Sequence, residues 1–218
     1  MTMTVFTSSY TQGGYIWAGS AGDGFFVAPG VAVTDTSAAV NNVEDYIAFI
    51  DTEGSSTAQI DGSVTAAGAP LILGNGYSGS GTANIQIGSG GSVNGDNATY
   101  AAIQIHQNLS HGREGELITN AGVIDGAGQA ISSNAYGSIT NNGAIYAGSD
   151  AVDNFDGVST DTVSLFNHGT ISGGSYGVID TGGHVAVIYN SGAIDGALMR
   201  SSRTPPPPKR SPITPPGR

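Results

Sequence analysis

The side chains of this sequence that could carry out chemistry are its aspartates, and the chemistry they suit is hydrolysis of a glycosidic bond. Such hydrolases use two carboxyl groups about 5 to 9.5 Å apart, one as acid and the other as nucleophile or base. Asp153 and Asp180 are the candidate catalytic pair, because they fall one residue apart in register on adjacent copies of the repeat described below. Asp125 and Asp195 share a repeat position but lie three copies apart, roughly 14 Å at the spacing of β-strands. That distance is too long for a pair, and solvated turns also favour short polar residues such as Asp153 and Asp180.

The sequence contains fewer of the side chains that other catalytic mechanisms require. A polysaccharide lyase needs an Arg or Lys base and further cations that neutralise the uronate, whereas residues 30–196 offer Arg113 alone and no Lys. Residues 106–116 are the most charged part of this region and predict a loop extruded from the repeats, a common location for function. No His-Glu-x-x-His pair occurs among the four histidines, which are His106, His111, His168 and His184.

Metal binding is considered because four aspartates cluster in one long repeat: Asp150, Asp153, Asp156 and Asp161. An EF-hand loop fitted to this stretch places its first ligand on Val152 and its final glutamate on Thr162 or Val163, and none of these replaces a carboxylate. We therefore expect an exposed acidic loop here, with no metal and no cofactor. The chain contains no Cys, which excludes thiolate metal sites and disulfides.

The composition indicates one sizeable domain whose charge is sharply divided. The chain has 218 residues, of which 39% are hydrophobic and 35 are glycine without a collagen period. All 17 carboxylates lie at or before Asp195, and five of the six basic residues follow it. Residues 1–199 therefore carry a formal charge of −16 and the last 19 residues carry +5. The acidic region repels phosphate backbones, so we expect no nucleic-acid partner, and no apolar run is long enough for a transmembrane helix.

A seven-residue phrase, Asn-x-Gly-x-Ile-x-Gly, recurs along the second half of the chain. Its copies begin at Asn120, Asn141, Asn167 and Asn190, and the second copy ends in Ala instead of Gly. The Ile of the phrase has equivalents farther upstream, which gives the series Val33, Val64, Val93, Ile124, Ile145, Ile171 and Ile194. The spacings along this series are 31, 29, 31, 21, 26 and 23 residues.

Each repeat contains three short apolar segments separated by Gly, Asn and Ser. One precedes the phrase, one is the phrase itself, and one returns seven residues after the marker, at Val40, Leu71, Tyr100, Ile131, Val152 and Val178. Periods of 20 to 50 residues are typical of solenoids, and no repeat has the periodicity of an amphipathic helix. The pattern predicts an all-β fold, a right-handed parallel β-helix of about six to seven three-strand coils over residues 30–196.

The phrase suits such a coil physically. Coils stack at about 4.8 Å, so equivalent side chains lie over one another. Ile124, Ile145, Ile171 and Ile194 are the predicted core stack, and the four Asn residues that begin the phrases are the predicted amide ladder at a turn. The residue before each Asn should point outward. This external column would hold Thr119, Thr140, Phe166 and Tyr189.

The four phrases resemble the β-helical repeats of bacterial autotransporter passenger regions and haemagglutinin-like surface proteins. The resemblance covers roughly residues 30–196 and is strongest from residue 117. It implies a structural or adhesive segment of a bacterial surface or secreted protein, with a host-surface or glycan ligand. Right-handed β-helices also include carbohydrate-active enzymes, so a polysaccharide hydrolase or lyase-like activity is the alternative. The secretion signal and the membrane barrel of that family have no counterpart in this sequence.

The two ends of the chain differ from the repeats. Residues 1–29 predict a lead-in or cap whose only tryptophan, Trp17, could cover the apolar end of the stack. Residues 197–218 hold seven of the nine prolines and most of the basic residues, which indicates a disordered polyproline-type tail. Out-of-frame translation of GC-rich DNA is a second interpretation of this tail, and a ligand for an SH3-like partner is a third. An exposed last coil has unpaired strand edges, which predicts end-to-end self-association.

Aromatic residues could also form a sugar- or partner-binding strip. Phe166 and Tyr189 fall in the external column, and Tyr146 and Tyr176 lie on neighbouring coils. Aromatic residues also have high β propensity on exposed sheet faces, and that property alone accounts for the pattern.

Overall fold

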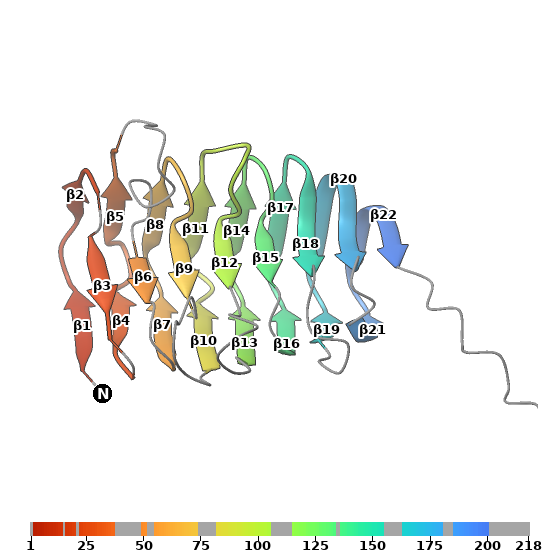
Figure 1. The fold of residues 1–218 in the computed structure, drawn as a ribbon, viewed down its shortest axis with the longest axis horizontal. Coiled ribbons are helices and arrows are strands. Elements are labelled where there is room, and N and C mark those ends of the chain that lie inside the picture. Colours follow the sequence, from red (N-terminus) through yellow and green to blue (C-terminus); the bar gives the residue numbers. More distant parts are fainter. Residues whose placement is uncertain are drawn as a thin grey trace, which may run out of the picture.

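The computed structural model describes residues 2–14, 16–20, 22–37, 49–51, 55–73, 82–105, 115–133, 136–154, 163–180 and 185–200. These residues form β-strands and no helix (Figure 1). All strand pairs are parallel and make up two sheets, of eight and fourteen strands. The expected all-β class with parallel strands is therefore confirmed. The described residues contain no helix of the length and hydropathy that a membrane crossing requires.

The eight-stranded sheet takes every third strand of the chain up to β19, and then β21. Each of its strands pairs with the next along the sheet through continuous register, with one irregularity between Val163 and Ser164. Its strands are β1 (Met3–Phe6), β4 (Gly24–Val27), β7 (Ser56–Ile60), β10 (Thr82–Ile87), β13 (Gly115–Asn120), β16 (Tyr136–Asn141), β19 (Val163–Asn167) and β21 (Val185–Asn190).

The fourteen-stranded sheet consists of two faces that are joined through one long strand, β20 (Thr170–Asp180). The N-terminal part of β20 pairs with β17 and its C-terminal part with β18. The first face also contains β2 (Tyr10–Gln12), β5 (Ala32–Asp35), β8 (Ser63–Ala66), β11 (Ser92–Gly95), β14 (Val123–Gly126) and β17 (Ala144–Ala147). The last strand, β22 (Ala193–Arg200), pairs with both parts of β20 and so continues both faces. The second face contains β3 (Trp17–Gly19), β6 (Phe49–Asp51), β9 (Leu71–Leu73), β12 (Ile103–Ile105), β15 (Ile131–Ser133) and β18 (Asp150–Asn154).

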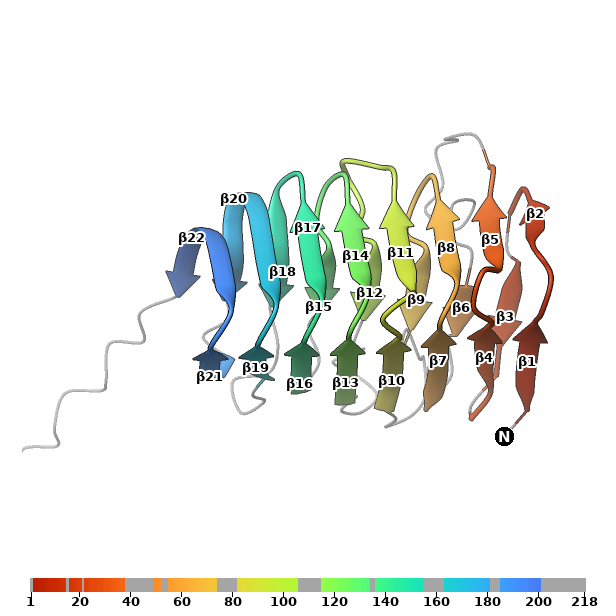
Figure 2. The same cartoon turned by 180° about the vertical axis from the view of Figure 1, so that it is seen from behind.

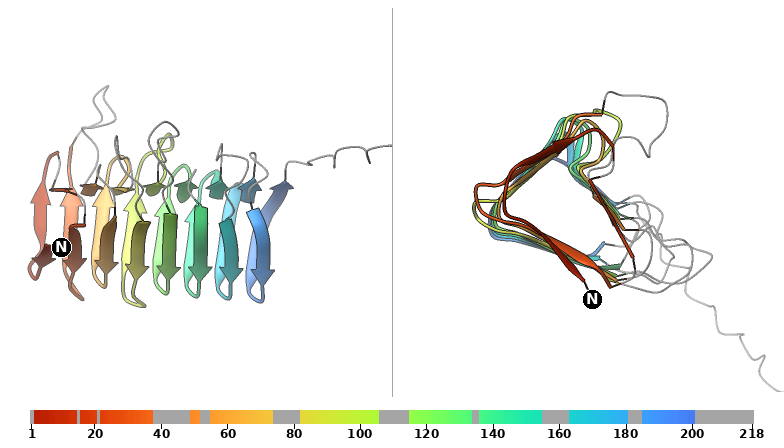
Figure 3. Two further views of the ribbon diagram at one scale, coloured as in Figure 1. Left: turned by 60° about the horizontal axis from the view of Figure 1, so that its bottom comes forward. Right: turned by 90° about the vertical axis from the view of Figure 1, so that its left-hand side faces the viewer.

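The chain therefore passes through three faces in turn and then begins the next layer. We call one such layer a coil. Seen end-on, the coils superpose as a three-sided outline, and the side views show them stacked in sequence order (Figure 3). Eight strands in the first sheet give eight coils, whereas the sequence predicted six to seven. The additional coil is formed by β1 to β3, because β1 pairs with β4, β2 pairs with β5 and β3 pairs with β6.

The register of the stack follows the series of aliphatic markers. Val33 pairs with Val64, Val64 with Val93 and Val93 with Ile124. The same column continues through Ile145, Ile171 and Ile194. This part of the predicted register is confirmed in every coil from the second to the eighth.

One marker of the second face was wrong. Ile103, and not Tyr100, pairs with Leu71 and Ile131. The corner that precedes β12 in this coil, residues 96–102, is longer than the seven-residue spacing allows, and Tyr100 packs instead against Ala69 and Ile72 on a small separate cluster. The predicted marker Val40 lies outside the described residues.

The interior of the stack is filled by side chains that alternate along each strand. In β7 the pattern places Ser56, Ala58 and Ile60 inward, and the next strand of the sheet repeats it with Ala83, Ile85 and Ile87. Period-two alternation of this kind is what a strand with one buried face requires. The core is one continuous cluster from Phe25 to Val178.

Aromatic rings fill the N-terminal end of that core. Phe25 and Phe49 are stacked with ring centroids 3.9 Å apart. Trp17 packs on Phe25 at 5.3 Å, and its indole Nε1 donates a hydrogen bond to Thr4 Oγ1 at 3.1 Å. Trp17 thus lies over the aromatic layer of the second coil, the position that the sequence suggested for it.

The glycine of the repeated phrase is required by contact between coils. A Cβ atom on Gly143 would lie 2.1 Å from the carbonyl oxygen of Gly122, and one on Gly169 would lie 2.0 Å from that of Gly143. Real Cβ atoms do not approach backbone oxygens this closely. The stacked corners at Gly143 and Gly169 therefore exclude a residue with a side chain, whatever its backbone angles. In the second coil the same register position is occupied by Val31.

Candidate functional site

The four phrase asparagines form a chain of amide hydrogen bonds along the stack. Asn120 Nδ2 donates to Asn141 Oδ1 at 2.8 Å, and Asn141 Nδ2 donates to Asn167 Oδ1 at 2.8 Å. Asn167 Nδ2 donates to Asn190 Oδ1 at 2.7 Å. The first three asparagines are fully buried, and Asn190 is exposed. We call this feature the amide ladder.

The amide ladder has a direction. Each buried Nδ2 also donates to a backbone carbonyl of the following coil, of Ala144, Thr170 and Ala193 in turn, at 2.9 to 3.0 Å. Apart from a longer contact of 3.3 Å from Asn167 Nδ2 to the carbonyl of Gly169 in its own coil, the bonds donated by the buried amides therefore run toward the C-terminal end of the stack. Because a buried polar group costs free energy unless it is paired, each rung depends on the coil that follows it.

The aliphatic stack lies beside the ladder. Ile124, Ile145 and Ile171 are fully buried, whereas Ile194 in the last coil is partly exposed. In the external column, Phe166 and Tyr189 stack with centroids 5.3 Å apart and planes 6° from parallel. The two rings therefore cover each other, and the free face of Tyr189 is turned toward the end of the stack. Tyr146 is exposed on another face of the stack, and Tyr176 lies on β20.

The predicted spacing of Asp125 and Asp195 is confirmed. The column runs from Asp125 through Tyr146 and Ser172 to Asp195, so three coil steps separate the two carboxylates. They are not brought together.

Asp153 and Asp180 occupy neighbouring register positions on adjacent coils, as expected. Asp153 pairs with Ile179, and Asp180 pairs with Asn154. Successive residues of a strand point to opposite faces, so the backbone register assigns the two positions to different columns. The side chain of Asp180 lies outside what the structure describes, and the pair remains a prediction.

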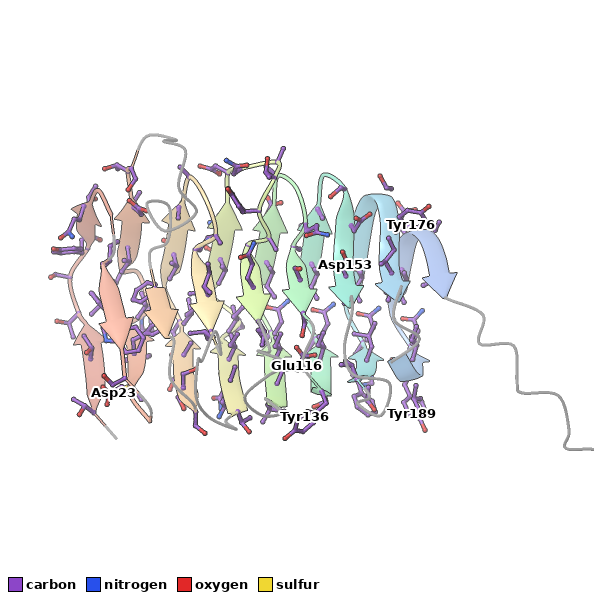
Figure 4. The ribbon with its side chains drawn as sticks, viewed as in Figure 1. Asp23, Glu116, Tyr136, Asp153, Tyr176 and Tyr189 are labelled. Atoms are coloured by element: carbon purple, nitrogen blue, oxygen red, sulfur yellow. The ribbon has the colours of Figure 1, made fainter. Side chains whose placement is uncertain are left out.

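Asp153 itself is an unusual carboxyl group (Figure 4). Its side chain is only 9% exposed, and Gln129 Nε2 donates to its Oδ2 at 2.5 Å, while Oδ1 is buried without a partner among the described residues. Burial raises the pKa of Asp153, and the nearby charge of Asp150 raises it further. The bond from Gln129 opposes this increase.

The sequence interpretation missed Glu116, which was assigned to the extruded loop. Glu116 begins the inward alternation of β13 and is 2% exposed. Ser133 Oγ, at the end of β15 on another face, donates to its Oε2, and Oε1 has no partner among the described residues. Burial raises the pKa of Glu116 to about 7, and the bond from Ser133 lowers it only in part. Counting back by two from Ile118 would have placed this carboxyl inside.

Metal ligands do not converge in the described part of the chain, where no group of three His, Asp or Glu side chains could hold an ion. His168 is exposed, and its Nδ1 lies 2.7 Å from Ser191 Oγ. The remaining candidates fall outside the described residues, namely His106, His111, His184, Arg113, Asp156 and Asp161.

Comparison of the chain with family models, with curated proteins and with solved structures gave no match.

Proposed function

We propose that this chain is a right-handed parallel β-helix that serves as a structural or adhesive segment of a bacterial surface or secreted protein. The amide ladder and the unbroken marker column carry the proposal, because they make one rigid stack from short repeats. Crossover connections between parallel strands are right-handed in nearly all proteins. The surface location and the adhesive role rest on the resemblance of the repeated phrase.

The adhesive role predicts that an immobilised panel of oligosaccharides retains the purified chain. We expect the double substitution Phe166→Ala with Tyr189→Ala to weaken retention roughly tenfold, because a sugar ring stacks on aromatic faces in the external column. Surface plasmon resonance measures the change. Tyr146→Ala is the matched control, since Tyr146 is also exposed but lies on another face. Equal loss in both variants would contradict a site at Phe166 and Tyr189, and a panel without any binding would contradict glycan adhesion.

A carbohydrate-active enzyme is the second candidate, and Asp153 is the observation that favours it. A carboxyl group whose pKa is raised by burial can keep a proton near neutral pH and donate it to a leaving group. Asp153 has such surroundings. Asp180, in the adjacent register column of the next coil, is the second carboxylate that the sequence offers.

The enzyme candidate predicts release of reducing ends from a polysaccharide panel by the wild-type chain. Asp153→Asn and Asp180→Asn should each lower that rate by at least a hundredfold, while Asp125→Asn, an exposed carboxylate on β14, should leave it unchanged. Activity that all three variants share would exclude Asp153 and Asp180, and a wild-type chain with no turnover would end the hypothesis.

A further inference from the structure

Both ends of the stack present unpaired strand edges (Figure 2). Within the described residues, the three strands of the first coil pair only with strands of the second. At the other end, β21 pairs only with β19, and β22 pairs only with β20. Unpaired edges of this kind are templates for association.

The exposed apolar side chains concentrate at the same two ends. Of the eight large hydrophobic residues that are exposed in the described structure, five belong to the first or last coil. Met3, Val5 and Tyr10 lie in the first coil, and Tyr189 and Leu198 lie in the last. Ile194, beside them, is also partly exposed.

The amide ladder leaves a donor at the last coil. The Nδ2 of each earlier asparagine donates to both an amide oxygen and a backbone carbonyl of the next coil, while Asn190 Nδ2 has neither among the described residues. The last coil therefore presents amide hydrogens that, in every earlier coil of the ladder, are bound by oxygen atoms of the coil that follows.

Charge distinguishes the two ends. The first coil, residues 3–19, carries no charged side chain, and the residues that follow it up to 112 carry carboxylates and no Lys or Arg. The last coil carries Asp195, and residues 200–218 after it carry five basic residues and no carboxylate. Two C-terminal ends would repel each other, and a C-terminal end beside an N-terminal end attracts.

We propose that copies of this chain assemble head to tail, with the last coil of one copy stacked on the first coil of the next. Continuing the register columns places Ile194 against Tyr10 of the second copy and Leu198 against its Trp17. The same columns bring Asn190 Nδ2 toward the backbone carbonyl of Ser9 of the second copy. The contact repeats without closure, so the product is an open series of oligomers.

One residue limits this contact. In the register columns, Ser8 occupies the position of Gly192, where a Cβ would meet a carbonyl oxygen of the preceding coil, as it does at Gly192 itself at 2.0 Å. The first coil has nothing beneath it, so Ser8 is tolerated in a single copy. In the assembly its side chain forces the corner apart, and the association is weaker than that of two internal coils.

Sedimentation velocity of the full chain over a concentration series tests the proposal. The wild type should form a series of oligomers that continues beyond the dimer and weakens as ionic strength rises. Ile194→Lys should abolish it by placing a charge in the contact, while Leu117→Lys, an exposed apolar residue on the side of the stack, should not. Ser8→Gly should tighten the association several-fold, and circular dichroism confirms that each variant is folded.

The proposal is overturned by a wild type that stays monomeric at every concentration, by a closed dimer, or by equal effects of Ile194→Lys and Leu117→Lys. No tightening in Ser8→Gly would overturn the register columns as the geometry of the contact. Glycan binding plays no part in these measurements, so their outcome is independent of the adhesive role.

Discussion

Asn141→Ala is expected to destabilise the stack by about 3 kcal/mol, because a buried amide that bridges three coils leaves several polar groups unpaired. Asn141 accepts from Asn120 Nδ2 and donates to Asn167 Oδ1 and to the Thr170 carbonyl. All three asparagines are fully buried, so water does not replace the lost partner. Urea unfolding monitored by circular dichroism measures the loss.

Asn190→Ala is the matched control for that experiment. It removes an equivalent amide from the exposed last rung, where only the ladder bond donated by Asn167 Nδ2 is lost and that Nδ2 keeps its bond to the Ala193 carbonyl. We expect a cost of about 1 kcal/mol or less. Stability in a stack depends on contacts between neighbouring coils, so Asn141→Ala should also loosen the last coils first in hydrogen exchange. Equal losses in the two variants would show that burial of the amide ladder contributes nothing.

Glu116→Gln is expected to remove a large part of the dependence of stability on pH. The folded pKa is raised from 4.5 to about 7, so the folded state binds a proton that the unfolded state releases. The favourable contribution is complete below pH 4.5 and is lost as pH rises to about 7. The slope is about 1.4 kcal/mol per pH unit, which amounts to a loss of about 3 kcal/mol across that window. The glutamine carries no charge and should keep the contact with Ser133.

The measurement is the free energy of unfolding in urea across that pH range. Wild type and Glu116→Gln should be equally stable at the acid end, and the variant should be more stable by about 3 kcal/mol above pH 7. Asp125→Asn, which removes an exposed carboxylate from the following strand, controls for net charge. Parallel curves for wild type and Glu116→Gln would show that Glu116 is not buried as a neutral acid.

The sequence by itself determined the strand class, the parallel order and most of the register. Val33, Val64 and Ile124 recur at one position of a phrase, and stacking identical side chains leaves a single alignment. The amide ladder followed for the same reason, because an asparagine at a fixed position of each coil lies directly over its predecessor. When one residue type recurs at the same position of each repeat, the stacking of these residues can be predicted without knowing the conformation of the segments between them.

The tertiary structure decided what depends on corner length and on contacts between faces. Ile103 replaced Tyr100 because a longer corner shifted the strand, and a hydrophobic pattern does not encode the length of a corner. Strands β1 to β3 form a coil because they pair with the next layer, although the repeated phrase is missing there. Glu116 meets Ser133 only across two faces of one coil, where burial of a carboxyl depends on a partner from another strand. The sequence around Glu116 does not reveal this partner, because Ser133 comes close to Glu116 only once the strands of the coil are in place.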